Sequence, residues 1–156
     1  MIAFRLAAGL AAAALVFGGE ATAKDLPKGG LTAKEVQAWL FESGYQAELD
    51  KDGDEPFIKS AADGVNFEVH LYDCEKDRCA SIQLTAGFDV KDKMSVDEAN
   101  AWNSDKRYVD CFIDEEGDPW FTYDINLSPG GTRESLDDDF QVWLSFLPDM
   151  KSHIGW

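Results

Sequence analysis

Two runs of alternating apolar and polar residues, 65–74 and 79–88, form the most regular pattern in the chain. Successive residues of a β-strand point to opposite faces, so each run would bury one face and expose the other. The pattern predicts a β-hairpin that turns at residues 75–78. If Cys74 lies opposite Cys79, every apolar residue meets an apolar partner. The expected pairs are Leu71 with Ile82, Val69 with Leu84, Phe67 with Ala86, and Val65 with Phe88.

The same register brings two of the three cysteines together at the turn of the hairpin. Opposed residues of an antiparallel pair have Cβ atoms about 4.5 Å apart, which suits a disulfide between Cys74 and Cys79. The alternatives are a metal site that adds His70 and Tyr72, or two free or redox-active thiols. A Cys-x4-Cys spacing is at the limit for zinc, and no second pair exists. Cys111 is expected to be a buried free thiol.

Helical spacing and turn signals predict the remaining elements. Capping boxes begin helices at Thr32 and Ser95, and Thr132 begins a third helix that we expect to end at Pro148. Extended runs cover 45–50, 55–61, 107–114 and 120–127, and Asp-Gly steps mark turns between them. Phe57 and Ile58 are adjacent, so the facing of 55–61 stays open. The predicted fold is α+β, an antiparallel sheet with helices in the order α-β-β-β-β-α-β-β-α.

The first 23 residues have the composition of a secretory signal peptide. Arg5 precedes an apolar run over 6–17, and Ala21-Thr22-Ala23 predicts cleavage between Ala23 and Lys24. The run is too short for a transmembrane helix, and an uncleaved anchor is the alternative. We expect a periplasmic or secreted mature chain that does not insert into the membrane. Residues 24–30 would be a flexible lead-in, 31–150 a single domain, and 151–156 a tail.

The net charge of −16 limits the partners that the chain can attract. Nucleic acid and anionic lipid both require Lys and Arg on the protein, so neither is expected as a partner. The charge itself has two interpretations, solubility or an acidic binding surface.

No motif of a nucleophilic or metal-dependent enzyme is present, and no cofactor is predicted. Asp50, Asp52, Asp54 and Glu55 resemble a calcium loop, but the glycine and glutamate that such a loop needs are missing. The acidic run 137–139 is expected to complement the dipole of the last helix. A hydrolase that uses paired carboxylates stays open, since so many acidic residues always supply some pair.

Five short segments resemble the YbjN domain family, and the resemblance covers most of residues 31–147. They are Pro56-Phe57-Ile58-Lys59, Gly64-Val65-Asn66-Phe67, Ala99-Asn100-Ala101-Trp102-Asn103, Glu116-Gly117-Asp118-Pro119, and Tyr123-Asp124-Ile125-Asn126-Leu127 with Gly130-Gly131. The family is described as sensory transduction regulators, with a fold similar to that of type III secretion chaperones. The resemblance implies binding of an extended peptide or self-association, and it implies no active-site residues. The signal peptide departs from cytosolic secretion chaperones.

Four aromatic residues are expected on strand faces opposite the predicted core: Tyr72, Tyr108, Phe112 and Trp120. A contiguous apolar patch there would mark a contact surface for a protein, a peptide or a second copy of the chain. The alternative is that helices cover each ring. The function predicted from these features is an exported, non-catalytic binding, chaperone-like or regulatory protein that acts through a sheet face or edge. A carboxylate-based periplasmic hydrolase and a structural or stress-related envelope protein are the alternatives.

Overall fold

The computed structural model describes residues 24–156, so the predicted signal peptide, 1–23, lies outside the described residues. The elements follow the order α-β-β-β-β-α-β-β-α, as predicted. They are α1 (Ala33–Glu42), β1 (Glu48–Asp52), β2 (Glu55–Ala62), β3 (Val65–Glu75), β4 (Arg78–Gly87), α2 (Val96–Asp105), β5 (Asp110–Ile113), β6 (Pro119–Asn126) and α3 (Arg133–His153). The strands form one antiparallel sheet in the order β1-β2-β3-β4-β6-β5. The fold is therefore α+β.

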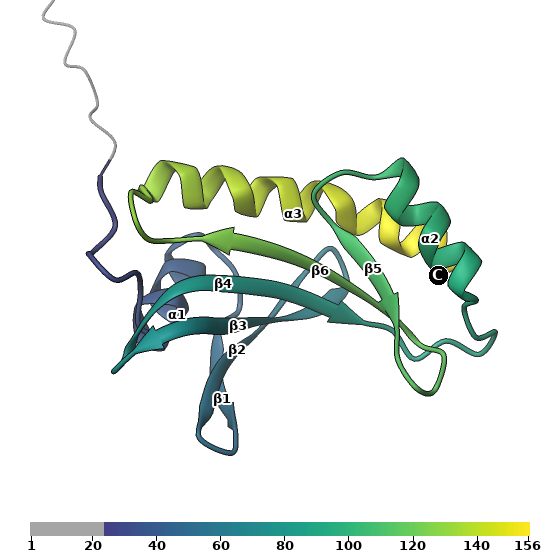
Figure 1. Ribbon diagram of the computed structural model, residues 1–156, viewed down its shortest axis with the longest axis horizontal. Helices are drawn as coiled ribbons and strands as arrows, with labels where there is room; N and C mark the ends of the chain where they lie inside the picture. Colours follow the sequence, from purple (N-terminus) through teal and green to yellow (C-terminus); the bar gives the residue numbers. More distant parts are fainter. Residues whose placement is uncertain (1–23) are drawn as a thin grey trace, which may run out of the picture.

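The sheet has helices on one face only. Helices α2 and α3 run above the sheet in Figure 1. Aromatic contacts join all three helices to that side. The Phe140 ring of α3 lies 5.2 Å from Trp39 of α1 and 6.1 Å from Phe67 of β3. The Trp102 ring of α2 lies 4.8 Å from Phe121 of β6. The core fills this layer, and no helix among residues 24–156 has the length and apolar character needed to cross a membrane.

The central hairpin has the predicted register at its turn end. Cys74 pairs with Cys79, Leu71 with Ile82, and Val69 with Leu84. The predicted pair of Val65 with Phe88 is wrong, because β4 ends at Gly87. The N–H of Phe88 instead donates to the carbonyl of Pro119 at 3.1 Å, and its ring packs against Phe121. The start of β6 therefore holds Phe88, which follows Gly87 along β6 instead of pairing with Val65 of β3.

A tight turn determines how β2 faces the sheet. Asp63 and Gly64 both have positive φ, 49° and 78°, as a type I′ hairpin turn requires. The resulting register places Ile58 opposite Val69 in the core. Phe57 therefore points to the other side of the sheet, where it stacks on His70 at a ring distance of 5.2 Å. The ambiguous facing of this strand is thus resolved by its turn.

Helix α3 continues through Pro148 to His153, so the predicted end at Pro148 is wrong, and residues 151–153 of the predicted tail are helical. Proline inside a helix removes one backbone hydrogen bond and usually ends the helix. Here Pro148 lies on the exposed side, while Met150 is fully buried and the His153 ring lies 5.2 Å from Trp102. The burial of this last part outweighs the lost bond.

The lead-in segment, 24–30, is hydrogen-bonded to two distant parts of the fold. The N–H of Leu26 donates to the carbonyl of Gly131 at 2.9 Å, and the N–H of Arg133 donates to the carbonyl of Lys24 at 2.8 Å. Leu31 then exchanges two backbone hydrogen bonds with Cys79, at 2.9 and 3.1 Å. These bonds seat the segment, predicted as a flexible lead-in, against the start of α3 and the disulfide hairpin.

Candidate functional site

The helices leave the opposite face of the sheet uncovered; we call it the helix-free face. Residues directly opposite one another in neighbouring strands point to the same face. The strand pairing therefore places two rows of side chains here, running from β1 toward β5. One row is Glu48, Lys59, Glu68, Thr85, Thr122 and Asp110, and the next is Asp50, Phe57, His70, Gln83 and Asp124.

A groove with a volume of about 440 Å³ lies on this face; we call it the sheet groove. Its lining comes from the chain around β1 and from β2, β3, β4 and β6. The lining residues are Gln46, Glu48, Lys59, Ser60, Ala61, Asn66, Phe67, Glu68, Thr85, Gly87 and Trp120. The lining therefore combines apolar and polar side chains with two acidic residues, Glu48 and Glu68, and one basic residue, Lys59, and it has one aromatic end.

The aromatic end of the groove is formed by Trp120 lying over Gly87. A Cβ atom at residue 87 would approach the indole carbon Cε2 to 2.7 Å, so only glycine lets the ring lie flat on the strand. Trp120 Nε1 donates to Asp114 Oδ2 at 2.9 Å, and this bond lowers the pKa of Asp114. The ring of Phe112, half exposed, stacks on Trp120 with a centroid distance of 6.4 Å and an interplanar angle of 13°.

The neighbouring part of the helix-free face carries acidic and aromatic side chains together. His70 Nε2 lies 2.9 Å from Glu68 Oε2, and the His70 ring stacks on Phe57. Tyr72 is 46% exposed, yet partial burial raises the pKa of its hydroxyl, and the charges of Asp124 and Glu55 raise it further. Negative charges nearby stabilise a positively charged group and destabilise a negatively charged one.

The aromatic surface predicted from the sequence divides into separate parts. Phe112 and Trp120 come together at the end of the groove. Tyr72 shares the face but pairs with Ser81, six positions along β4 from Gly87, so it lies about 20 Å from Trp120. Tyr108 contacts Tyr123, whose hydroxyl donates to Asp139 of α3, and therefore belongs to the helix side. The sequence pattern did not reveal that strand position would separate these rings.

Cys74 and Cys79 are joined by a disulfide, and Cys111 is a free, buried thiol. Cys79 is buried and forms a β-bridge with Leu31. Cys74 is exposed beside a cleft of about 740 Å³ that the hairpin turns of the sheet share with the start of α1. Burial raises the pKa of the Cys111 thiol to about 11. Its Sγ lies 3.9 Å from Met94 Sδ, so this cysteine is part of the hydrophobic core.

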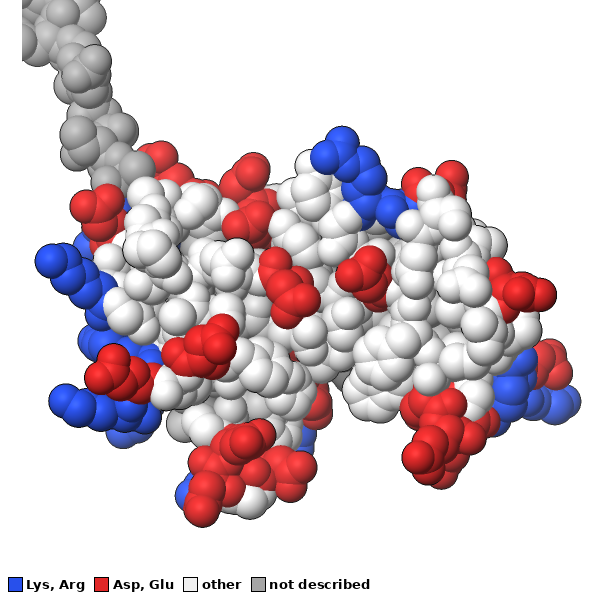
Figure 2. Space-filling view, viewed as in Figure 1, with Lys and Arg blue, Asp and Glu red and all other residues white. Residues whose placement is uncertain are grey.

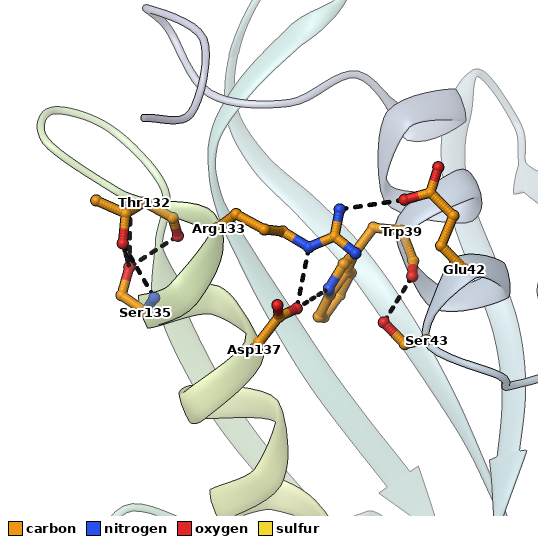
Figure 3. Close-up of polar contacts among 7 residues, drawn as sticks. All are labelled: Trp39, Glu42, Ser43, Thr132, Arg133, Ser135 and Asp137. Atoms are coloured by element: carbon orange, nitrogen blue, oxygen red, sulfur yellow. Dashed lines mark hydrogen bonds and ion pairs between the residues drawn. The ribbon is translucent and has the colours of Figure 1, made fainter. Parts of the chain in front are cut away.

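A polar network joins α1 to α3 and uses part of the acidic run 137–139 (Figure 3). Asp137 Oδ1 accepts from Trp39 Nε1 at 2.8 Å and from Arg133 Nε at 3.0 Å. Arg133 also pairs with Glu42 at 3.2 Å. The sequence predicted that this run would complement the helix dipole; in the structure the acidic residue in the first turn is Glu134. Asp137 is instead a hydrogen-bond acceptor that fixes two helices together.

The remaining acidic candidates are also held by local partners. Asp50, from the suspected calcium loop, forms an ion pair with Lys59 across β1 and β2. Asp118 is buried, and hydrogen bonds from Lys93 Nζ at 2.6 Å and from the N–H of Val90 at 3.0 Å lower its pKa. Within residues 24–156, no group of three or more His, Cys, Asp or Glu side chains is arranged to hold a metal ion.

Comparisons with known proteins identify the family of this chain. A search of the curated proteins finds no match. The model of the YbjN family, described as "Putative bacterial sensory transduction regulator", matches residues 32–155, from the N-cap of α1 to beyond the end of α3. The match spans most of the sequence and every helix and strand of the fold, and the chain therefore belongs to the YbjN family.

Proposed function

We propose that the protein is an exported, non-catalytic regulator that holds an extended polypeptide on the helix-free face of its sheet, in the manner of a chaperone. The observation that carries this proposal is the sheet groove. It crosses the strands on the one sheet face that the helices leave open, and it ends at the Trp120 ring, on which the Phe112 ring stacks. Exposed aromatic rings beside a groove are typical of surfaces that bind partners.

The edges of the sheet are less suited to binding than its face. At the β5 edge, the side chain of Asn103 takes the place of a neighbouring strand. Its Nδ2 donates to the carbonyl of Cys111 at 2.9 Å, and its Oδ1 accepts from the N–H of Cys111 at 2.7 Å. The β1 edge, Glu-Leu-Asp-Lys-Asp, is short and charged, which is how proteins discourage strand addition. Binding through the face therefore has the stronger support.

Two observations support export and a regulatory role. A disulfide such as Cys74–Cys79 persists in oxidising compartments, which agrees with a signal peptide at the start of the chain. The family description is that of a regulator, which favours binding over catalysis. The buried carboxylate of Asp118 is engaged by Lys93 away from the groove, so it supports stability of the loops rather than hydrolysis.

The proposal is tested with the chain 24–156 and a display library of random peptides without charge bias. Selected peptides should perturb the amide NMR signals of Thr85, Gly87 and Trp120, which lie in the groove. Asn66→Trp fills the groove with bulk and should abolish binding. Asn100→Trp, the same substitution at an exposed site on α2, is the matched control. Peptides that bind Asn66→Trp as tightly as the wild type, or that perturb only the helix side, would contradict the proposal.

A further inference from the structure

The helix-free face is strongly acidic, and this decides what can occupy it. Strand pairing places acidic side chains there from every strand except β4. They are Glu48, Asp50, Asp52, Glu55, Glu68, Asp110 and Asp124. Lys59 is the one Lys or Arg that the same pairing places on this face, among the residues that the structure describes. Figure 2 shows acidic side chains spread over the visible surface, with Lys and Arg at its margins.

Most of this negative charge is not neutralised within the chain. Among the carboxylates of this face, the ammonium group of Lys59 forms an ion pair with Asp50 alone. Asp124 accepts a neutral hydrogen bond from Gln83 Nε2 at 3.0 Å, which leaves its charge in place. Within the described chain, Glu48, Glu55 and Asp110 accept no side-chain hydrogen bond at all. These carboxylates are therefore available to form ion pairs with a positively charged partner.

The same charge argues against a second copy of the chain as the occupant. Two copies that pack face to face would bring two sets of uncompensated carboxylates together, and like charges at an interface cost several kcal/mol. The homodimer expected as one alternative from the sequence is therefore disfavoured at this surface. The alternative interpretation of the charge, an acidic binding surface, gains support from the gathering of acidic side chains on the helix-free face, two of which, Glu48 and Glu68, line the groove.

We infer that the segment bound in the sheet groove is an extended, basic polypeptide whose Lys and Arg side chains meet the carboxylates of the helix-free face. This inference rests on the proposed function and names the chemistry of its partner. An extended chain presents every second side chain to one side, so alternate basic residues would all reach the sheet. The Phe112 and Trp120 rings provide aromatic surfaces on which a guanidinium or ammonium group can lie.

The test uses three fluorescent twelve-residue peptides that alternate threonine with Lys, Gln or Glu. Fluorescence anisotropy measures their affinities for the chain 24–156. The Lys peptide should bind about 10-fold more tightly than the Gln peptide, and the Glu peptide should not bind. Raising the ionic strength from about 20 mM to about 200 mM should weaken the Lys peptide by about 10-fold, since screening acts on exposed charges. Equal affinities for the Lys and Gln peptides would overturn the inference.

Charge variants locate the attraction on the face. Glu68→Gln and Asp124→Asn should each weaken the Lys peptide about 3-fold and leave the Gln peptide unchanged. Asp138→Asn, which removes the same charge from an exposed site on α3, is the matched control. If Asp138→Asn weakens binding as much as Glu68→Gln, the attraction is due to the overall charge and the inference fails.

The outcomes separate this inference from the proposed function. The library could yield neutral or acidic peptides whose binding is abolished by Asn66→Trp. That result would support the proposed function and refute the basic partner. Light scattering at low ionic strength should show a monomer. A stable dimer that protects the helix-free face would also refute the inference.

Discussion

Removing the disulfide should destabilise the protein by a modest amount that follows from the short loop. The bond joins Cys74 to Cys79, only five positions apart, around the two-residue turn of the central hairpin. In the chain-entropy account, a loop of this length restricts the unfolded chain by about 2 kcal/mol at 25 °C. The figure is an upper value, because the turn between Glu75 and Arg78 already favours the closed hairpin.

The variant Cys74→Ala/Cys79→Ala measures this contribution without a reductant. With a slope of about 1–3 kcal/mol per molar urea, the urea midpoint should fall by about 1 M. Cys111→Ala controls for thiol exchange. The amide of Leu31 should remain protected, because its two hydrogen bonds to Cys79 involve backbone atoms only. A loss above about 4 kcal/mol, or loss of protection at Leu31, would show that the disulfide positions the lead-in and would refute this reasoning.

Three further predictions concern buried and paired groups. Trp39→Phe removes the donor to Asp137 and should lower the free energy of unfolding by about 2 kcal/mol in a urea titration, whereas Trp156→Phe, at an exposed ring, should change it by less than about 0.5 kcal/mol. Cys111, buried and with a pKa of about 11, should resist iodoacetamide at pH 8 and react in urea; rapid labelling of the native protein by mass spectrometry would contradict its burial. The bond from Lys93 lowers the pKa of Asp118 in the folded state, so its stabilisation is present above the unfolded pKa of about 3.9 and is lost as pH falls toward the folded value. Asp118→Asn should therefore lower stability at neutral pH and reduce the loss of stability below pH 4, and an unchanged pH profile would refute the role of this pair.

Local signals predicted most of the elements because each depends on a few neighbouring residues. The capping boxes at Thr32 and Ser95 form as expected, since their side chains bond to backbone groups only three positions away. The Cys74–Cys79 register follows from alternation and from a two-residue turn. The strand around Trp120 faces as predicted, with Phe121 buried and the intervening positions more exposed. In each case the determining contacts lie close together in the sequence.

The errors arose where distant segments compete for the same residues. Pro148 carries a local signal for the end of a helix, yet Met150 finds a place in the core and the helix continues. Phe88 fits the alternation of its strand, yet its N–H bonds to Pro119 at the start of β6. Asp137 fits a helix-dipole role, yet Trp39, from the other end of the chain, donates to it. None of these partners can be identified from local spacing.

By itself, the sequence determined the order of the elements, the central hairpin and the excess of negative charge, because alternation, capping and composition are properties of the chain alone. Only the tertiary structure decided the order in which the six strands pair beneath the helices. That arrangement collects carboxylates from separate strands on the helix-free face, and it separates Tyr72 and Tyr108 from the Trp120 ring. The physical reason is strand order: residues far apart in sequence become neighbours only when their strands pair.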